Sequence, residues 1–476
     1  MGISLDELSA GLARVFARAG LGALSLEPQR LTGGAVMESW FFRTVPEAAS
    51  QSPPPPTPSR EEEGAFVLRR APSLAFMEGR PYGHATEAAL IEAARGKGVT
   101  APEVVAVLDE ADGLGSGFVM CALPGTADPK VILACDDPDG LLREVARDLA
   151  RIHRLRPGDV PEGVPVMDYA GAIADLKAQF MDAGGDRPII ALGLKWLEDN
   201  VGLLSHPQPL PQAGGEQMVL NHGDYRMGNL LVEGSRLTGV LDWEIAHFGD
   251  RHEDLAFGCM AVWRFARYDR PALGLGSVED YIAAYEAEAG AKIDPARFRF
   301  WTIYRTVWWA LGCLKMAAQW RSGADRMLER VVISRRTSEQ ELDLLLLLEE
   351  DAPEAERARP VVLYTPPAPQ GEATDGELAQ AIFEWLGTVK DRFEGHDRFQ
   401  YAVARNALGM ISRFSLGSIP ATENPDLAAR MLAGTASLAD PGTLAELRGA
   451  ILAAVAQDVP KYPALAHARK KWTGEE

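Results

Sequence analysis

The sequence predicts an α+β protein with two lobes, a small mixed one and a larger helical one, followed by an all-helical domain. Strand-like runs concentrate in residues 1–125, whereas helical periodicity dominates from Asp168 onward. A stretch rich in proline and acidic residues at 349–373 then interrupts the helical pattern. Because 476 residues exceed what one hydrophobic core usually supports, we expect two or three domains.

The first elements predict a small sheet preceded by a helix. Ser4 and Glu7 form a capping-box pattern that opens an amphipathic helix. The segment Arg30–Thr44 places a glycine turn between β-branched and apolar residues, which is typical of a hairpin, and a further strand is expected at Phe66–Arg69. The proline-rich stretch 50–64 cannot join a sheet ladder, so we expect an exposed insertion between strands.

The following elements complete the small lobe and begin the helical one. Helices are expected at Thr86–Arg95 and Leu141–Leu155, and strands at Val104–Leu108 and Phe118–Leu123. Later in the chain, short strand-like runs at Met218–Ile245 interrupt the helices.

These elements suggest a division into one two-lobed domain, a linker and a helical domain. Near residue 374, Thr374 and Glu377 repeat the capping-box pattern at the start of a new helical series. The expected boundaries are 1–348 for the first domain, 1–125 and 126–348 for its lobes, 349–373 for the linker, and 374–476 for the helical domain.

Composition excludes several classes of protein. A formal net charge of −19 argues against a general nucleic-acid surface, since phosphate backbones bind clustered Lys and Arg. No apolar run is long enough to span a bilayer, and the first residues lack the pattern of a secretory signal. The four cysteines, Cys121, Cys135, Cys259 and Cys313, lack metal or disulfide spacing. We expect a soluble, cytoplasmic protein without a membrane partner.

The residues that carry chemistry lie in the segments VLNHGDYRMGNLLV and LTGVLDWE. Four residues separate Asp224 from Asn229, and Asp242 follows thirteen residues later at the end of an apolar strand. This spacing is typical of a kinase catalytic loop followed by a metal-binding aspartate. The alternative is a β-hairpin in which Asp224 and Asn229 are turn residues and Asp242 caps a helix.

The pattern HGDxxxxN followed by LDWE closely resembles the aminoglycoside phosphotransferase and choline-kinase superfamily. The resemblance extends from about Gln29 to Trp320 and implies a bilobal protein-kinase-like fold that uses ATP and Mg²⁺. It implies that Asp224 is the catalytic base, or orients the acceptor hydroxyl, and that Asn229 and Asp242 bind Mg²⁺.

The resemblance gives supporting roles to residues around this loop. His222 would support the loop without being catalytic, and Asp254 would brace it, although a helix-start cap also explains Asp254. His153 matches a family position and is expected to be a packing or hydrogen-bonding residue.

A nucleotide site is expected in the small lobe. Thr32, Gly33 and Gly34 stand where the family has its phosphate-covering loop, and Ser39 could add a contact, although paired glycines in a hairpin are also ordinary turn residues. Cys121 and Leu123 lie on a strand that resembles the hinge offering backbone groups to adenine.

Arg69 is the main departure from the family pattern. It stands on the strand where a kinase carries its phosphate-binding lysine. Arginine can hold phosphates bidentately but is not geometrically equivalent to lysine, so the nucleotide geometry is open. Strand alternation favours Arg69 over Arg70, and Glu87 on the following helix is its expected partner.

Within the superfamily, VLRR, NHGDYRMGNLLV and VLDWEIAHFGD look like kinase domains fused to acyl-CoA dehydrogenases. This resemblance implies ATP- and Mg²⁺-dependent phosphorylation of a hydroxyl on a small molecule such as a hydroxyacyl compound. One alternative is an aminoglycoside or macrolide phosphotransferase, and another is a catalytically weak nucleotide-binding regulatory module. The helical domain resembles an uncharacterised domain found with these kinases, and docking, dimerisation and substrate presentation are open roles for it. The preference between ATP and GTP and the oligomeric state are also open.

Overall fold

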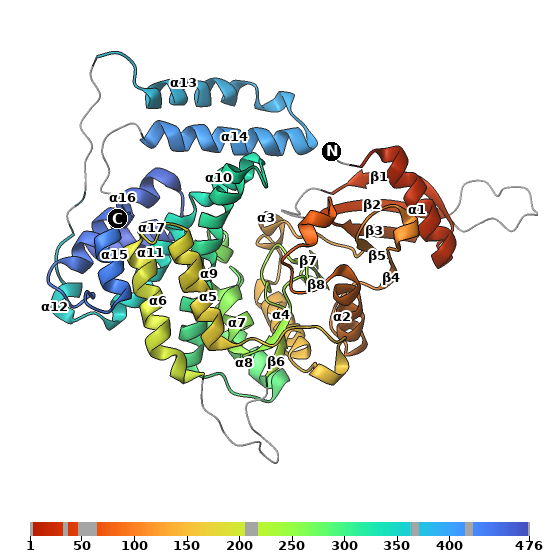
Figure 1. Cartoon of the computed structure of the whole chain (residues 1–476), viewed down its shortest axis with the longest axis horizontal. Helices are drawn as coiled ribbons and strands as arrows, with labels where there is room; N and C mark the ends of the chain where they lie inside the picture. The colour runs from red at the N-terminus through yellow and green to blue at the C-terminus, as the bar shows by residue number, and fades with distance from the viewer. Residues whose placement is uncertain are drawn as a thin grey trace, which may run out of the picture. The chain divides into compact units, whose positions relative to one another are not determined.

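The computed structural model divides the chain into two compact units, traced in Figure 1. The described residues are 3–31, 37–45, 64–204, 218–361, 363, 371–414 and 422–474. The first unit comprises Met1–Met167, Gly214–Gly258 and Leu275–Ile293, and the second comprises Asp168–Ala213, Cys259–Gly274 and Asp294–Glu476. The expected proline-rich insertion, apart from its last residue Gly64, lies outside the described residues.

A five-stranded antiparallel sheet forms the N-terminal part of the first unit. Its strands are β1 (Ala23–Arg30), β2 (Glu38–Val45), β3 (Gly64–Arg70), β4 (Val104–Val107) and β5 (Gly117–Cys121), in the spatial order β1-β2-β3-β5-β4. The pairing of β1 with β2 confirms the predicted hairpin. The register places Ser39 opposite Arg69 and Phe66 opposite Cys121.

Helix α1 (Leu5–Ala19) packs its apolar stripe against this sheet. The capping box is present, because the Ser4 hydroxyl accepts the N–H of Glu7 and the Glu7 carboxylate accepts the N–H of Ser4. The ring of Phe16 of α1 packs tilted against that of Phe42 of β2, with 5.1 Å between ring centroids. The stripe and the strands share one buried cluster that includes Leu8, Leu12, Phe16, Phe42, Phe66, Leu68, Leu114 and Val119.

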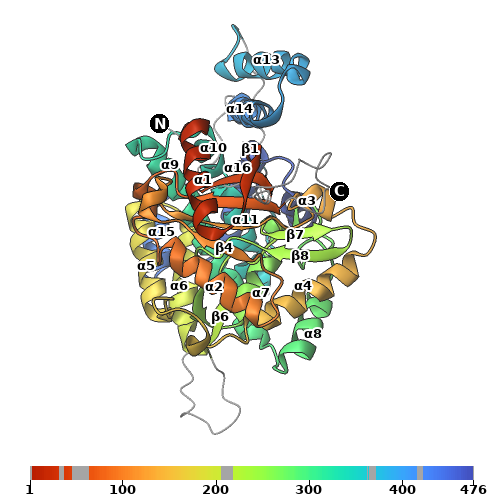
Figure 2. The same cartoon turned by 90° about the vertical axis from the view of Figure 1, so that its right-hand side faces the viewer.

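The remainder of the first unit combines helices with two small sheets. Its other elements are η1 (Leu74–Met77), α2 (His84–Gly96), η2 (Glu110–Asp112), α3 (Pro129–Ile132), α4 (Pro138–Ile152), η3 (Pro157–Asp159), β6 (Val219–Asn221), β7 (Leu230–Glu233), β8 (Arg236–Val240), β9 (His247–Gly249), α7 (His252–Cys259) and α8 (Val278–Ala289). Helix α4 packs against α8, while β6 pairs with β9 and β7 pairs with β8. Figure 2 shows β7 and β8 side by side.

The second unit is helical in its described residues. Its elements are α5 (Tyr169–Asp182), α6 (Pro188–Asn200), η4 (Val201–Leu203), η5 (Ala261–Arg264), α9 (Pro295–Ser322), α10 (Leu328–Ser334), α11 (Thr337–Leu348), η6 (Glu349–Asp351), α12 (Glu354–Arg357), α13 (Asp375–Thr388), η7 (Lys390–Arg392), α14 (Gly395–Phe414), α15 (Pro425–Leu432), α16 (Thr443–Asp458) and α17 (Pro463–Thr473). The prediction of a mixed lobe followed by helices is confirmed. Across the described part of the chain, no helix has the length and apolar character needed to cross a membrane.

The compact units do not follow the boundaries expected from the sequence. Helix α15 packs against α6, and α16 and α17 pack against α11, so these C-terminal helices share one unit with earlier ones. Residues at the start of the expected linker are ordered, because the buried carboxylate of Glu349 pairs with Arg448 and Lys471. Proline and acidic composition marked a linker, but these long-range ion pairs fix its first residues within the helical unit.

Helix α11 buries ionisable groups that make the stability of the second unit depend on pH. Burial raises the pKa of Asp343 to about 7, and only one of its carboxylate oxygens is hydrogen-bonded, to the Tyr462 hydroxyl. An acid whose pKa is raised by folding favours the folded state while protonated, so its contribution falls as pH rises from about 4 to 7. Glu341, whose pKa burial also raises to about 7, acts in the same direction.

Replacing Asp343 with asparagine is expected to flatten this dependence. Asparagine stays neutral and can still accept a hydrogen bond from the Tyr462 hydroxyl. The decrease in the free energy of unfolding between pH 5 and 8 should therefore be about 1–3 kcal/mol smaller in the variant than in wild type. Thermal unfolding at both pH values measures the difference. Asp182→Asn, at an exposed position, serves as the control, and equal pH slopes for Asp343→Asn and wild type would contradict the role of Asp343.

Candidate functional site

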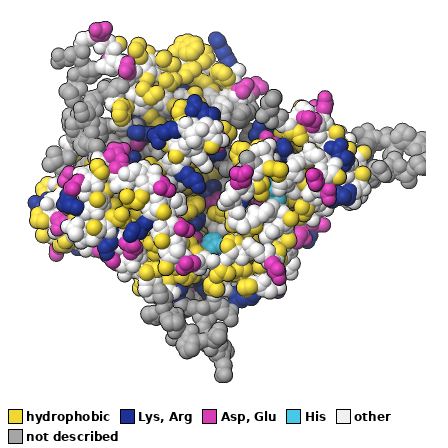
Figure 3. Space-filling model, in the orientation of Figure 1, with side chains coloured by type: hydrophobic (Ala, Val, Ile, Leu, Met, Phe, Trp, Pro, Cys, Tyr) yellow, Lys and Arg dark blue, Asp and Glu magenta, His cyan; other side chains and the backbone are white. Residues whose placement is uncertain are grey.

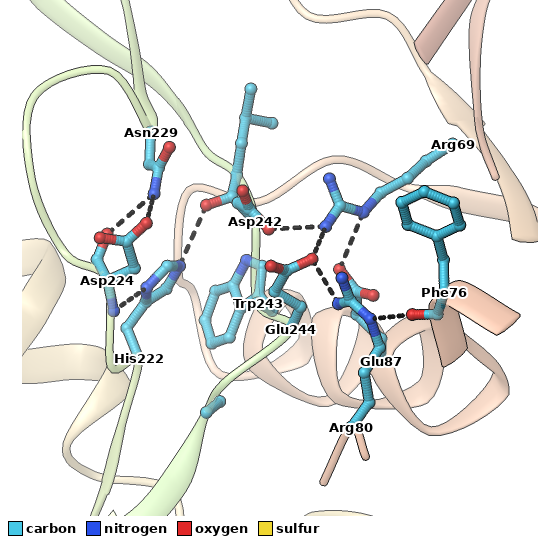
Figure 4. A network of polar contacts seen from close by, with 12 residues as sticks. Arg69, Phe76, Arg80, Glu87, His222, Asp224, Asn229, Asp242, Trp243 and Glu244 are labelled. Atoms are coloured by element: carbon cyan, nitrogen blue, oxygen red, sulfur yellow. Dashed lines mark hydrogen bonds and ion pairs between the residues drawn. The ribbon is translucent and has the colours of Figure 1, made fainter. Parts of the chain in front are cut away.

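The loop between β6 and β7 brings Asp224 and Asn229 together (Figure 4). The Asn229 amide nitrogen donates to a carboxylate oxygen of Asp224 at 2.6 Å and to the Asp224 carbonyl at 3.0 Å. The other Asp224 oxygen pairs with Arg226 at 2.8 Å. Strands β6 and β7 belong to different sheets, so this loop is not the hairpin turn considered as the alternative.

Two opposing effects set the acidity of Asp224. Burial raises the pKa of its carboxyl, and the nearby Asp242 acts in the same direction, whereas Arg226 lowers it. The net pKa lies above the usual value for aspartate. A carboxylate with a raised pKa is a better proton acceptor than a solvated one.

His222 joins this loop to the next strand. Its Nδ1 accepts the backbone N–H of Asp224 at 3.2 Å, which leaves Nε2 to donate to the Leu241 carbonyl at 3.1 Å. Burial lowers the pKa of His222, and this arrangement suits a neutral ring. Leu241 in turn donates its N–H to the Asn229 carbonyl at 2.8 Å, so His222 and Leu241 hold the metal-ligand candidates together.

Asp254 of α7 fixes the start of the same loop. Its carboxylate accepts the backbone N–H groups of His222 at 2.6 Å and Gly223 at 2.9 Å, and contacts His153 at 3.2 Å. The N-terminus of α7 is capped instead by Asp250, whose carboxylate accepts the N–H of His252. Asp254 therefore braces the loop. The N–H at the start of α7 is bound by Asp250, and not by Asp254 as the alternative from the sequence expected.

Asp242 has an unusual backbone conformation. Its φ is +68°, in the left-handed region that aspartate tolerates better than most side chains. The side chain is 31% exposed, and one carboxylate oxygen accepts a hydrogen bond from Arg69 at 2.6 Å. This conformation directs the Asp242 carboxylate toward β3, as Figure 4 shows.

Arg69 of β3 is surrounded by three carboxylates. Its guanidinium lies 3.2 Å from Glu87, 2.6 Å from Asp242 and 2.7 Å from Glu244. Burial opposes its charged form, but the three carboxylates outweigh burial and raise its pKa. Arg70, next along the strand, points to the other face, where it pairs with Glu38 at 2.6 Å.

A second set of contacts around Asp242 was not predicted from the sequence. Arg80 pairs with Glu244 at 2.7 Å, and the Tyr82 hydroxyl donates to the Trp243 carbonyl and accepts the Ala246 N–H. Both residues follow β3 in irregular chain, where no periodicity or motif marks a contact about 160 residues away. The segment after β3 is thereby tied to the segment LDWEIA.

The remaining nucleotide-site candidates are distributed along the sheet. Thr32, Gly33 and Gly34 lie outside the described residues. Ser39 is the cross-strand neighbour of Arg69, so the two residues share one face of the sheet. Cys121 is the last residue of β5. The side chain of Leu123 lies close to Gly239 of β8, because a Cβ atom added at Gly239 would be 2.5 Å from a methyl carbon of Leu123.

The oxygen atoms at this site suit a hard divalent cation. The Asn229 amide nitrogen is engaged with Asp224, which leaves its oxygen as a ligand, and Asp242 offers a carboxylate. Mg²⁺ is bound in proteins through one or two such oxygens, with substrate phosphates and water completing its coordination. Asn229 and Asp242 therefore fit Mg²⁺ held together with a nucleotide.

The antiparallel sheet with its buried Arg–Glu pair, the Asp–Asn loop and the left-handed aspartate together define a kinase-like phosphotransferase. The chain belongs to the phosphotransferase enzyme family of the aminoglycoside phosphotransferases, whose model matches residues 59–301, just over half of the chain. This membership confirms the family predicted from the sequence.

Two relatives of this chain are named as acyl-CoA dehydrogenases. Mouse acyl-CoA dehydrogenase family member 10 is 26% identical over 241 residues, which cover 46% of this chain and 21% of the mouse protein. The Arabidopsis thaliana protein named probable acyl-CoA dehydrogenase IBR3 is 25% identical over 122 residues, covering 23% of this chain and 14% of the plant protein. The matched region thus spans about a fifth or less of these relatives.

A solved structure shares the fold. A Ralstonia eutropha protein assigned to the aminoglycoside phosphotransferases superposes with a TM-score of 0.52 at 19% identity, covering 72% of this chain and 98% of that protein. This likeness confirms the predicted fold class.

Proposed function

We propose that this chain transfers the γ-phosphoryl group of ATP to a hydroxyl group of a small molecule. The observation that carries the proposal is a set of three contacts: Asn229 donates to the Asp224 carboxylate, Leu241, which precedes Asp242, donates its N–H to the Asn229 carbonyl, and Arg69 donates to Asp242. Phosphoryl transfer requires this combination, because a carboxylate must meet the attacking hydroxyl while cations hold the phosphates.

In the proposed reaction Asp224 acts on the acceptor. Its carboxylate orients the hydroxyl and accepts its proton as the hydroxyl oxygen bonds to the γ-phosphorus, while the bond from that phosphorus to the bridging β-phosphate oxygen breaks. Asn229 holds the Asp224 carboxylate in place through its amide nitrogen. Burial favours proton transfer to Asp224 by raising the pKa of its carboxyl.

The other side chains would bind the nucleotide. Arg69 can direct its guanidinium at the α- and β-phosphates, with Glu87 fixing its orientation. Asn229 and Asp242 would hold Mg²⁺, which supplies positive charge against the phosphate oxygens. Ser39 lies next to Arg69 and would add a phosphate contact, and the strand that ends at Cys121 would offer backbone groups to adenine.

We further infer that the acceptor is a hydroxyacyl compound. The support is the similarity to proteins named as acyl-CoA dehydrogenases, which points to acyl metabolism more than to antibiotics. The four cysteines carry reduced thiols, which would suit the reducing cytoplasm as the site of action.

The proposal is tested by incubating the protein with Mg²⁺ and ATP and a panel of acceptors, read by mass spectrometry. The panel contains hydroxyacyl-CoAs, free hydroxy acids, amino alcohols, aminoglycosides and macrolides. One added phosphate on a hydroxyacyl compound, absent with Asp224→Ala, is the expected result. If only an aminoglycoside or a macrolide were phosphorylated, the acceptor would be an antibiotic and not a hydroxyacyl compound. Tight ATP binding without turnover would favour the regulatory alternative.

Replacing Asp242 with asparagine is expected to damage binding and turnover together. Asparagine tolerates the left-handed backbone but removes the charge that attracts both the metal and Arg69. We expect the Mg²⁺ concentration for half-maximal activity to rise at least about tenfold and turnover to fall by about a hundredfold or more. Magnesium titration of activity measures the first effect, and unchanged Mg²⁺ dependence would show that Asp242 is not a metal ligand.

A further inference from the structure

The guanidinium of Arg69 depends on Glu244 for its orientation as well as on Glu87. Glu87 lies 3.2 Å from Nε of Arg69, but that nitrogen makes no hydrogen bond to a described residue. The hydrogen bonds of Arg69 come from Nη2, which donates to Asp242 at 2.6 Å and to Glu244 at 2.7 Å. Because a planar group held at one corner by an ion pair can still turn, these two hydrogen bonds complete its orientation.

Glu244 is itself held by Arg80, as Figure 4 shows. Oε2 of Glu244 accepts hydrogen bonds from Nη2 of Arg69 and from Nη1 of Arg80, each at 2.7 Å. Nε of Arg80 donates in turn to the Phe76 carbonyl at 2.8 Å, which ties Arg80 to the backbone of η1. The carboxylate of Glu244 thus has a fixed position between two guanidinium groups.

One edge of the Arg69 guanidinium remains open. Nε faces Glu87 and Nη2 faces two carboxylates, whereas Nη1 has neither a hydrogen bond nor an ion pair to any described residue. Nη1 is not sealed from solvent, so a ligand can reach it. Arginine N–H groups form strong, charge-assisted hydrogen bonds with phosphate oxygens. The open edge, next to the candidate Mg²⁺ ligand Asp242, therefore suits a phosphate group.

Net charge does not supply the attraction for a nucleotide. The formal net charge is −19, and over the face that Figure 3 shows, basic side chains are interspersed with acidic ones. The cluster around Arg69 also has an acidic excess, since it contains three carboxylates and two guanidinium groups, those of Glu87, Asp242, Glu244, Arg69 and Arg80. Binding of a triphosphate therefore depends on Mg²⁺ and on the direction of individual N–H groups.

We propose that Glu244 is a positioning residue for the nucleotide: held by Arg80, it turns the guanidinium of Arg69 so that Nη1 meets the phosphates. The inference rests on the proposed function, since it concerns the same nucleotide, but it assigns a role to two residues that touch neither the acceptor nor the phosphates. Once Asp242 binds Mg²⁺, Glu244 is the carboxylate that retains Nη2 of Arg69.

Calorimetric titration with Mg²⁺–ATP and with adenosine tests the role of Glu244. Glu244→Ala is expected to raise the dissociation constant for Mg²⁺–ATP about tenfold and to leave that for adenosine within about twofold, because only the phosphates meet Arg69. Glu244→Gln, which keeps an acceptor oxygen, should recover part of the lost affinity. The control is Glu288→Ala, which removes a carboxylate of similar exposure, 25% against 22%, that pairs with Arg154 in the same unit. This control should match wild type.

The possible outcomes separate this inference from the proposed function. Equal losses of affinity for ATP and adenosine would give Glu244 a structural role only, and a raised Mg²⁺ requirement at saturating ATP would make it a metal ligand; either result would overturn the proposal. If wild type and Glu244→Ala bind Mg²⁺–ATP equally tightly, the positioning role is wrong while the proposed function stands. If wild type binds no Mg²⁺–ATP, the proposed function fails and this inference fails with it.

A double-mutant cycle tests the part of Arg80. Arg80→Met should weaken Mg²⁺–ATP binding about threefold, and Arg80→Lys should weaken it less. Because Arg80 acts through Glu244, adding Arg80→Met to Glu244→Ala should cause no further loss of affinity. Additive losses would show that Arg80 meets the phosphates itself, which would overturn its role as the support of Glu244.

Discussion

Replacing Asp224 with asparagine should reduce phosphoryl transfer at least about a thousandfold while leaving nucleotide affinity within about threefold. The amide keeps the shape of the side chain and its contact with Asn229 but cannot accept a proton from the acceptor hydroxyl. Because Asp224 would act on the acceptor and not on the nucleotide, kcat should fall while binding of ATP, measured by calorimetry with Mg²⁺, is retained.

The control is Asp136→Asn, at an exposed position of the same unit. It should match wild type in both measurements. An Asp224→Asn variant with full turnover would show that another group accepts the proton, and a variant that also lost ATP binding would place Asp224 at the nucleotide.

Replacing Arg69 with methionine is expected to damage both stability and nucleotide binding. It would leave the buried Glu87 without its cation, next to Asp242 and Glu244. Removing one partner of a buried ion pair destabilises by about 3–5 kcal/mol. Part of this loss should be relieved by protonation of Glu87, whose pKa burial already raises to about 7. Denaturant unfolding and ATP titration measure the two effects.

Three further variants separate the roles of Arg69. Arg69→Lys keeps the charge but not the planar fork, so it should retain the fold and part of the nucleotide affinity. Adding Glu87→Gln to Arg69→Met should recover stability but not ATP binding. Arg70→Met removes an equally buried cation from the other face of β3, and should lower stability without changing ATP affinity. Loss of ATP binding in Arg70→Met would mean that stability alone explains the effect at Arg69.

The sequence predicted the central part of the candidate site because its chemistry is encoded locally. Asp224 and Asn229 are five residues apart in one loop, and Asp242 follows the next hairpin. Their spacing can therefore be recognised in the sequence without knowledge of the fold. The choice of Arg69 over Arg70 followed from strand alternation, and the structure places Arg69 on the face with Glu87 and Asp242.

Contacts between distant segments could not be predicted in this way. Arg80 and Tyr82 reach the segment after Asp242, and nothing in their own neighbourhood specifies it. The boundary between the compact units also depends on distant contacts. The composition around Glu349 is typical of a linker, but in the structure Glu349 is buried and pairs with Arg448 and Lys471. Composition describes a segment by itself, whereas burial depends on what the rest of the chain brings to it.

The carboxylate of Asp254 also determines how the loop that contains Asp224 and Asn229 opens. The amide protons of His222 and Gly223 are both donated to this one buried side chain, so neither can exchange with solvent until α7 moves away. Loop and helix thus form one cooperative segment, although about thirty residues separate them in the chain. Gradual warming should therefore abolish activity in a single step, together with the release of α7, and not through earlier fraying of the loop.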